Sequence, residues 1–92
     1  MPDEKIGVVI KYFGKIGVAA ITLTDGPLKV GDILHITGHT TDLHFTVDSI
    51  QVEHESVPDA AQGTDVGIKV PDKVRDHDQV FRVIDEEGSV SV

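Results

Sequence analysis

The chain has 92 residues and no cysteine, so it has room for one domain of ordinary size and carries neither a disulfide framework nor a thiolate nucleophile. Sixteen acidic residues against eight lysines and arginines give a net charge of -8, which repels nucleic acid and anionic lipid at long range. No apolar segment approaches the roughly 20 residues needed to span a bilayer. These features predict a cytoplasmic, single-domain protein without a membrane association.

The first third of the chain predicts β-strands separated by glycine-containing turns. Residues 6–13 are apolar and β-branched, residues 14–17 interrupt them with two glycines, and residues 18–23 resume the extended pattern. A further turn is expected at Gly31-Asp32. Glycine there tolerates positive φ, and the aspartate carboxylate can accept backbone N–H bonds.

The remainder continues the strand pattern with one change of phase. Residues 32–38 alternate apolar and polar side chains with period two, as a strand requires. Residues 41–52 change phase near Asp48-Ser49, where a β-bulge would return both apolar sets to the buried side. Two more strands are expected at 65–70 and 79–83. The one helical candidate is a single turn over residues 58–62.

Six strands with turns every 8 to 12 residues or so predict an all-β fold, a small closed antiparallel β-barrel of about six strands. Closure would remove exposed strand edges. The domain is expected to span residues 1–84, with residues 85–92 as a loosely attached tail. The residues expected to form much of the core are Val9, Leu34, Ile36, Phe45, Val47, Ile50, Val66 and Ile68.

Three ordered blocks carry a resemblance to a known domain. They are GPLKVGDILHITG (26–38), VDSIQVEHESV (47–57) and AAQGTDVGIKV (60–70). In this order and spacing they resemble the second domain of elongation factor Tu and its relatives, the β-barrel that follows the GTPase domain, over about residues 6–84. The same barrel also occurs at the carboxy end of the collagenase-like peptidase family and in ribosome-associated proteins, so the fold alone leaves the function open.

In elongation factor Tu this domain holds the aminoacyl end of transfer RNA, and the resemblance allows the contacting positions to be carried over. A glutamate that contacts the terminal adenosine corresponds to Gln51, an asparagine to Asp65 and an arginine to Thr22. All three differ, and losing the arginine removes a planar donor fork for phosphate. The resemblance therefore implies a partner-binding face at Gln51, His54, Glu55 and Asp65, without the pocket for the transfer RNA end.

Motifs for catalysis, cofactors and metals are missing. There is no Gly-x-x-x-x-Gly-Lys-Ser/Thr sequence for phosphates, and no serine has a local nucleophile signature, so no catalytic residue, no cofactor and no enzymatic activity are predicted. His35, His39, His44 and His54 lack the paired spacing of a zinc site. By strand parity His35 and His44 face solvent, and no metal site is predicted.

Three classes of function remain open. The favoured hypothesis is a non-catalytic binding module, a protein-interaction subunit related to translation factors or to a GTPase or peptidase complex. The alternative is an RNA- or ribosome-binding accessory protein in translation, and the third is an enzyme. Acidity and the missing pocket residues weigh against RNA, and the missing motifs weigh against an enzyme. The expected partner is another protein, with ribosome or transfer RNA left open.

Overall fold

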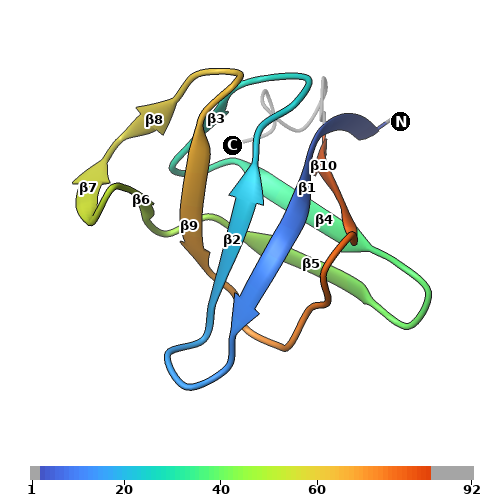
Figure 1. Ribbon diagram of the computed structural model, residues 1–92. Helices are drawn as coiled ribbons and strands as arrows, with labels where there is room; N and C mark the ends of the chain where they lie inside the picture. Colours follow the sequence, from blue (N-terminus) through green and yellow to red (C-terminus); the bar gives the residue numbers. More distant parts are fainter. Residues whose placement is uncertain (1–2, 84–92) are drawn as a thin grey trace.

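The computed structural model describes residues 3–83, which form ten strands and no helix (Figure 1). The strands are β1 (Asp3–Phe13), β2 (Val18–Thr22), β3 (Leu28–Lys29), β4 (Ile33–Thr37), β5 (Asp42–Thr46), β6 (Ile50–Val52), β7 (Glu55–Val57), β8 (Asp59–Ala60), β9 (Asp65–Lys69) and β10 (Gln79–Val83). Eight of them form one sheet in the order β5-β4-β10-β1-β2-β9-β6-β7, while β3 pairs with β8. All pairings are antiparallel, as predicted.

The sheet curls around the core but is not closed by hydrogen bonds within the described residues (Figure 1). Strands β5 and β7 stand at its two ends, and each pairs with a single neighbour between residues 3 and 83. The predicted all-β class is confirmed. The predicted closed barrel of about six strands is wrong, because the sheet is open and has eight strands.

The error in strand number begins at residues 41–52, which were expected to form one bulged strand. The chain instead turns a corner after Thr46 and starts a new strand at Ile50 that pairs with β9 and β7. The Val47 N–H donates to the Asp32 carbonyl at 2.9 Å, and the Val47 carbonyl accepts the Gly31 N–H at 2.9 Å. These backbone hydrogen bonds at the corner, rather than a β-bulge, bring both Val47 and Ile50 to the buried side.

The predicted helical turn at residues 58–62 is also wrong. Asp59 and Ala60 form β8, which pairs with β3, and the Val30 N–H donates to the Pro58 carbonyl at 3.0 Å. One helical turn fixes several residues for a single hydrogen bond, so an isolated turn is unfavourable. Pairing with β3 satisfies the same backbone groups through the sheet.

The turn predicted at Gly31-Asp32 is confirmed. Gly31 has a φ of 98°, and the Asp32 carboxylate accepts the Lys29 N–H at 2.9 Å. Strand β4 begins directly after this turn, and its Leu34 and Ile36 side chains are fully buried. The local chemistry of two residues therefore sets the start of a core strand.

Apolar side chains from most strands fill the space inside the curled sheet. The buried apolar residues are Ile6, Val9, Ala19, Ile21, Leu23, Leu28, Leu34, Ile36, Val47, Ile50, Ala60, Val66, Ile68, Val74 and Val80. Every predicted core residue is among them except Phe45, which is only partly buried at the edge of the core. Strand β5 is an end strand of the sheet, so its side chains have neighbours on one side only.

Two further expectations concern the limits of the domain and membranes. The predicted tail at residues 85–92 lies outside the described residues, and a single domain over residues 1–84 stays a prediction. Between residues 3 and 83 no helix is long and apolar enough to cross a lipid bilayer.

Candidate functional site

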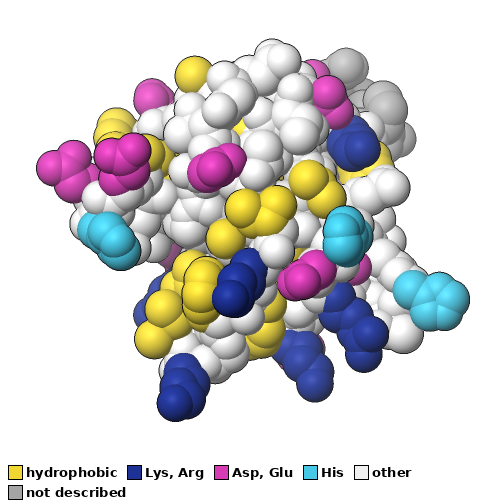
Figure 2. Space-filling model, in the orientation of Figure 1, with side chains coloured by type: hydrophobic (Ala, Val, Ile, Leu, Met, Phe, Trp, Pro, Cys, Tyr) yellow, Lys and Arg dark blue, Asp and Glu magenta, His cyan; other side chains and the backbone are white. Residues whose placement is uncertain are grey.

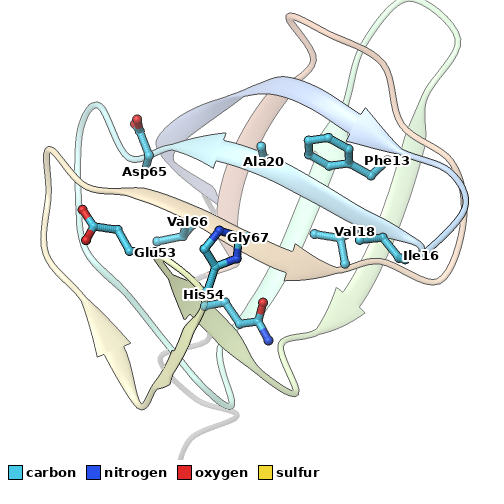
Figure 3. Close-up of a pocket in the computed structure, with 10 residues that line it drawn as sticks. Phe13, Ile16, Val18, Ala20, Glu53, His54, Asp65, Val66 and Gly67 are labelled. Carbon is cyan, nitrogen blue, oxygen red and sulfur yellow. The ribbon is translucent and has the colours of Figure 1, made fainter.

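A groove of about 410 Å³ lies on the outer face of the sheet, between the β1–β2 hairpin and the β6–β7 hairpin (Figure 3). Its lining residues come from β1, β2, β6, β9 and the two hairpin loops. They are Phe13, Ile16, Val18, Ala20, Gln51, Glu53, His54, Asp65, Val66 and Gly67. The groove is the candidate functional site because it joins exposed apolar side chains with carboxylates and an imidazole.

The floor of the groove is low because small residues meet across the strands. Ala20 on β2 pairs with Gly67 on β9, and Gly67 pairs in turn with Gln51 on β6. A methyl group and a hydrogen therefore occupy two places where larger side chains would fill the outer face. Phe13 and Ile16 stand beside this floor and expose 41% and 63% of their surface. Exposed apolar side chains clustered beside a hollow are typical of a binding surface.

The opposite wall is a tight hairpin with an unusual backbone. Val52 pairs with Glu55, so Glu53 and His54 form a two-residue loop, and their φ angles are 51° and 69°. Such loops normally contain Asn-Gly or Gly-Gly, because both positions need positive φ. Strained non-glycine residues of this kind cluster at ligand-binding sites. Here their side chains line the groove, which glycines could not do.

The polar groups are distributed unevenly along the groove. At one end Asp65 accepts a hydrogen bond from the Thr22 hydroxyl at 2.9 Å, which holds the carboxylate in place. In the other direction the groove adjoins a second hollow that is lined in part by Lys69. The Lys11 ammonium lies 5.4 Å from the centre of the Phe13 ring. Figure 2 shows this asymmetry as an apolar patch with basic side chains below it and acidic side chains above and to one side.

Three of the four residues of the predicted partner-binding face lie together in this groove. Gln51, His54 and Asp65 line it, whereas Glu55 opens β7 and lies outside the lining. The prediction missed Phe13 and Ile16, although an isoleucine in a turn between two glycines was a usable signal. These four residues as a binding face remain a proposal, developed below.

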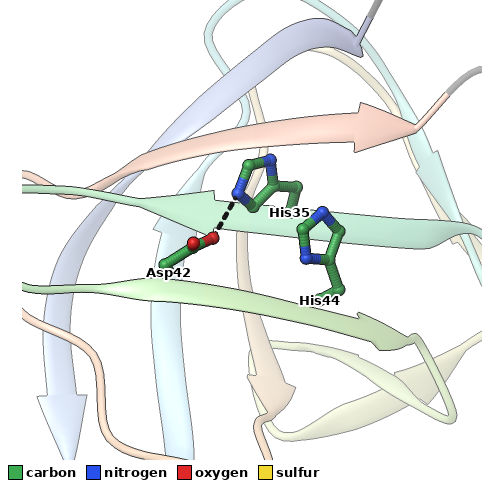
Figure 4. Close-up of side chains that lie close together, drawn as sticks. All are labelled: His35, Asp42 and His44. Atoms are coloured by element: carbon green, nitrogen blue, oxygen red, sulfur yellow. Dashed lines mark hydrogen bonds and ion pairs between the residues drawn. The ribbon is translucent and has the colours of Figure 1, made fainter. Parts of the chain in front are cut away.

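A second cluster lies on the outer face of β4 and β5 (Figure 4). His35 and His44 are direct cross-strand partners, and their rings stack with centroids 3.9 Å apart and an angle of 14° between planes. The His35 Nε2 atom lies 2.7 Å from an Asp42 carboxylate oxygen, and its Nδ1 atom lies 3.2 Å from an Asp3 oxygen. Both histidines are on the outer face, as strand parity predicted. Their rings stack on each other, and His35 also contacts two carboxylates.

The two carboxylates alter the acidity of His35. Burial of the ring disfavours its charged form, but the hydrogen bonds to Asp42 and Asp3 and their negative charges outweigh burial and raise the pKa of His35 above its ordinary value. The Phe81 and His44 rings pack beside the same ring. His35 is therefore a site where protonation and the folded structure are linked.

This linkage predicts a pH-dependent contribution to stability. Because the folded-state pKa is raised, the contribution of His35 is complete below its ordinary pKa of about 6.5 and is lost as pH rises through the folded value. The difference in unfolding free energy between the native chain and His35→Gln should thus be larger near pH 6 than near pH 8. Urea unfolding at a series of pH values in metal-free buffer measures it. A difference that grows with pH would contradict the assignment.

The chain is similar in sequence to proteins named as peptidases. Over 78 residues it is 38% identical to a collagenase of Porphyromonas gingivalis, a match covering 84% of this chain and 22% of the collagenase. It is also 38% identical over 78 residues to an uncharacterised protease of Methanocaldococcus jannaschii, covering 84% of this chain and 19% of the protease. The chain thus spans about a fifth of the length of these curated relatives. No protein-family profile matches it.

Solved structures share the fold. The C-terminal domain of a Geobacillus thermoleovorans protein assigned as a U32 peptidase superposes with a TM-score of 0.81 at 17% identity, covering 88% of this chain and 93% of that domain. The selenomethionine variant of the same domain gives a TM-score of 0.79 at 18% identity, with coverage of 85% and 98%.

These similarities correct two predictions. The resemblance to domain 2 of elongation factor Tu is wrong as an assignment, because the similar domain belongs to a U32 peptidase and the relatives are named collagenase and protease. Turn and strand patterns recur in barrel-like domains of unrelated function, so they could not separate the two families. The prediction that the chain is not an enzyme is contradicted by the same findings, because the relatives are named collagenase and protease.

Proposed function

We propose that this chain is the β-domain of a U32-type peptidase and that its outer-face groove binds an extended polypeptide segment. The observation that carries the proposal is the groove itself, whose apolar floor is bounded by a strained Glu53-His54 hairpin and by Asp65. The similarity to proteins named collagenase and protease supports a polypeptide as the ligand. In such proteins a domain of this kind would hold substrate for a peptidase centre located elsewhere in the assembly.

The groove suits a polypeptide for three physical reasons. Its floor at Ala20 and Gly67 is shallow and lies along strands, so it can accommodate an extended chain. Phe13 and Ile16 can bury apolar side chains of the ligand, which supplies most of the binding free energy at such surfaces. Asp65 at one end offers an acceptor for a basic side chain or for backbone N–H groups.

Nucleic acid fits these features poorly. The net charge of -8 opposes binding to phosphate, and the groove itself is rimmed by carboxylates of Glu53 and Asp65. Phe13 is the one Phe, Tyr or Trp side chain among the residues that line the groove, whereas sequence-tolerant binding of single strands depends on several stacking platforms. We therefore favour a polypeptide over RNA as the ligand of the groove.

The first test is a binding titration with fluorescently labelled gelatin, a denatured collagen, near physiological ionic strength. The double variant Phe13→Ser/Ile16→Ser should weaken binding at least about tenfold, because a tenfold loss is about 1.4 kcal/mol and two exposed apolar contacts exceed it. Ile33→Ser is the matched control, since Ile33 is also 41% exposed but lies on β4 outside the groove. Equal binding by all three proteins would overturn the groove assignment.

A second variant tests the contribution of the Glu53-His54 hairpin to binding separately from that of the exposed apolar side chains. Replacing Glu53-His54 by Asn-Gly supplies the residues that this loop geometry prefers and should raise the unfolding free energy by about 1 kcal/mol or more. The same variant should bind gelatin more weakly, because the two side chains that form the wall are gone. A more stable protein with unchanged binding would show that the hairpin has no part in it. Tighter binding to single-stranded RNA than to gelatin would overturn the polypeptide proposal.

A further inference from the structure

The histidine cluster on β4 and β5 lies apart from the groove and has the composition of a metal site. His35, Asp42 and His44 each present a ligand atom, and these atoms all lie within 4.8 Å of one another. None of the three lines the groove. We propose that His35, His44 and Asp42 bind one zinc ion, with Asp3 orienting His35 from behind.

The donor set is one that zinc favours. Two imidazole nitrogens and one carboxylate oxygen match the three protein ligands found in open zinc sites, where water takes the fourth position. Imidazole donors also select borderline metals such as Zn²⁺ over Ca²⁺ or Mg²⁺, which prefer oxygen ligands alone. His44 and Asp42 are exposed, so an ion can reach the site from solvent.

Asp3 supplies the arrangement that usually lies behind a metal-bound histidine. Metal-ligating histidines commonly donate their second ring N–H to a carboxylate, which fixes the tautomer and the ring orientation. Here the His35 Nδ1 atom faces an Asp3 oxygen at 3.2 Å. With its N–H on that side, His35 presents the Nε2 lone pair toward the Asp42 carboxylate, beside the stacked His44 ring.

The contact between His35 and Asp42 points the same way. A neutral imidazole has one N–H, yet both ring nitrogens of His35 face carboxylate oxygens, at 2.7 Å and 3.2 Å. The protonated ring satisfies both contacts with its two N–H groups, whereas the neutral ring, which is the form that binds metal, brings two lone pairs together at one of them unless a cation lies there. A zinc ion between Nε2 and the Asp42 oxygen would be attracted to both atoms.

Closing the site requires a small rearrangement. Zinc–ligand bonds of about 2.0–2.2 Å place tetrahedral donor atoms roughly 3.3 Å apart, so His35 Nε2 and the Asp42 oxygen, now 2.7 Å apart, must separate while the wider spacings within the 4.8 Å cluster close. The stacked rings have nearly parallel planes, so the His44 ring must turn out of the stack to aim a lone pair at the ion. His44 is exposed, so its ring has room to turn. The paired strands β4 and β5 hold the backbone positions fixed meanwhile.

The test is a calorimetric titration of the full chain with zinc chloride at neutral pH after chelator treatment and dialysis. We expect one zinc per chain and, by linkage, a higher unfolding temperature in the presence of zinc. His44→Gln should weaken binding at least about tenfold, and Asp3→Asn should weaken it about tenfold while leaving all three ligands in place. His39→Gln is the control, since His39 is exposed in the β4–β5 turn and is not part of the cluster.

Amide NMR spectra check that each variant is folded. His35→Gln should also abolish binding, but if that variant does not fold, the result with His44→Gln decides the test. Visible absorption of the cobalt form reports the number and kind of ligands. No binding at millimolar zinc would overturn the proposal. So would zinc binding that survives His44→Gln, or that falls equally in His39→Gln. These outcomes are independent of gelatin binding, so the zinc site and the groove are tested separately.

Discussion

Leu34→Ala should lower the free energy of unfolding by about 2–5 kcal/mol, the range measured for large-to-small substitutions in packed cores. Leu34 is completely buried between β4 and the other core strands, so alanine leaves a cavity that the surrounding sheet can only partly fill. A domain of this size has a total stability of about 5–15 kcal/mol, so the change is a large part of the whole. Urea denaturation followed by circular dichroism measures it.

Phe45→Ala is the control for this prediction. Phe45 is the direct cross-strand partner of Leu34 and has the larger side chain, but it is only partly buried. Because part of its surface already contacts water, its loss should cost about 1–2 kcal/mol, less than the loss of Leu34. If Phe45→Ala proves the more damaging change, the Phe45 side chain is packed more deeply in the core than its partial exposure indicates.

Gly7→Ala should destabilise the domain by at least about 2 kcal/mol, at the upper end of the usual cost of overpacking. A Cβ atom at Gly7 would overlap the carbonyl oxygen of Thr22, which is backbone and cannot rotate away. Gly7 pairs with Val80 of β10 directly after a register shift, and the adjacent Val8 pairs with Thr22 of β2. The backbone would have to move in the middle of the sheet. Thermal unfolding of the variant checks this result.

Gly67→Ala is the matched control, because it makes the same change in another strand. The nearest atom to a Cβ at Gly67 is a Val18 methyl at 3.5 Å, an ordinary contact. Alanine also restricts the unfolded chain more than glycine, so this variant should be as stable as the native chain or more stable by about 0.5–1 kcal/mol. Equal destabilisation by both substitutions would show that close packing at Gly7 is not the cause.

Particular residues show why much of the fold could be predicted. Leu34 and Ile36 were assigned to the core from period-two alternation, and both are buried. The Gly31-Asp32 turn was assigned from backbone chemistry and has the expected conformation and hydrogen bond. Both kinds of prediction depend on interactions within a few residues, which the order of amino acids specifies directly.

The errors occurred where distant segments decide the outcome. Whether residues 41–52 form one bent strand or two depends on the hydrogen bonds that Val47 makes with Gly31 and Asp32. Residues 59–60 became a strand because β3 lies beside them. Closure of the sheet depends on whether β5 and β7 meet, and no local pattern contains that information. The family assignment failed for a related reason, since its motifs describe turns and strands shared by several families.

For the candidate site, the sequence determined the residue types, and the resemblance to a known barrel named Gln51, His54 and Asp65 as members of one face. Only the tertiary structure decided that these residues border a groove with Phe13 and Ile16, because the pairing of β2, β9 and β6 brings them together. The same holds for His35 and His44, which are nine positions apart in sequence and become direct neighbours through the register of β4 and β5. Turns and strand faces depend on adjacent residues, whereas a site depends on the strand order and register that bring distant residues together.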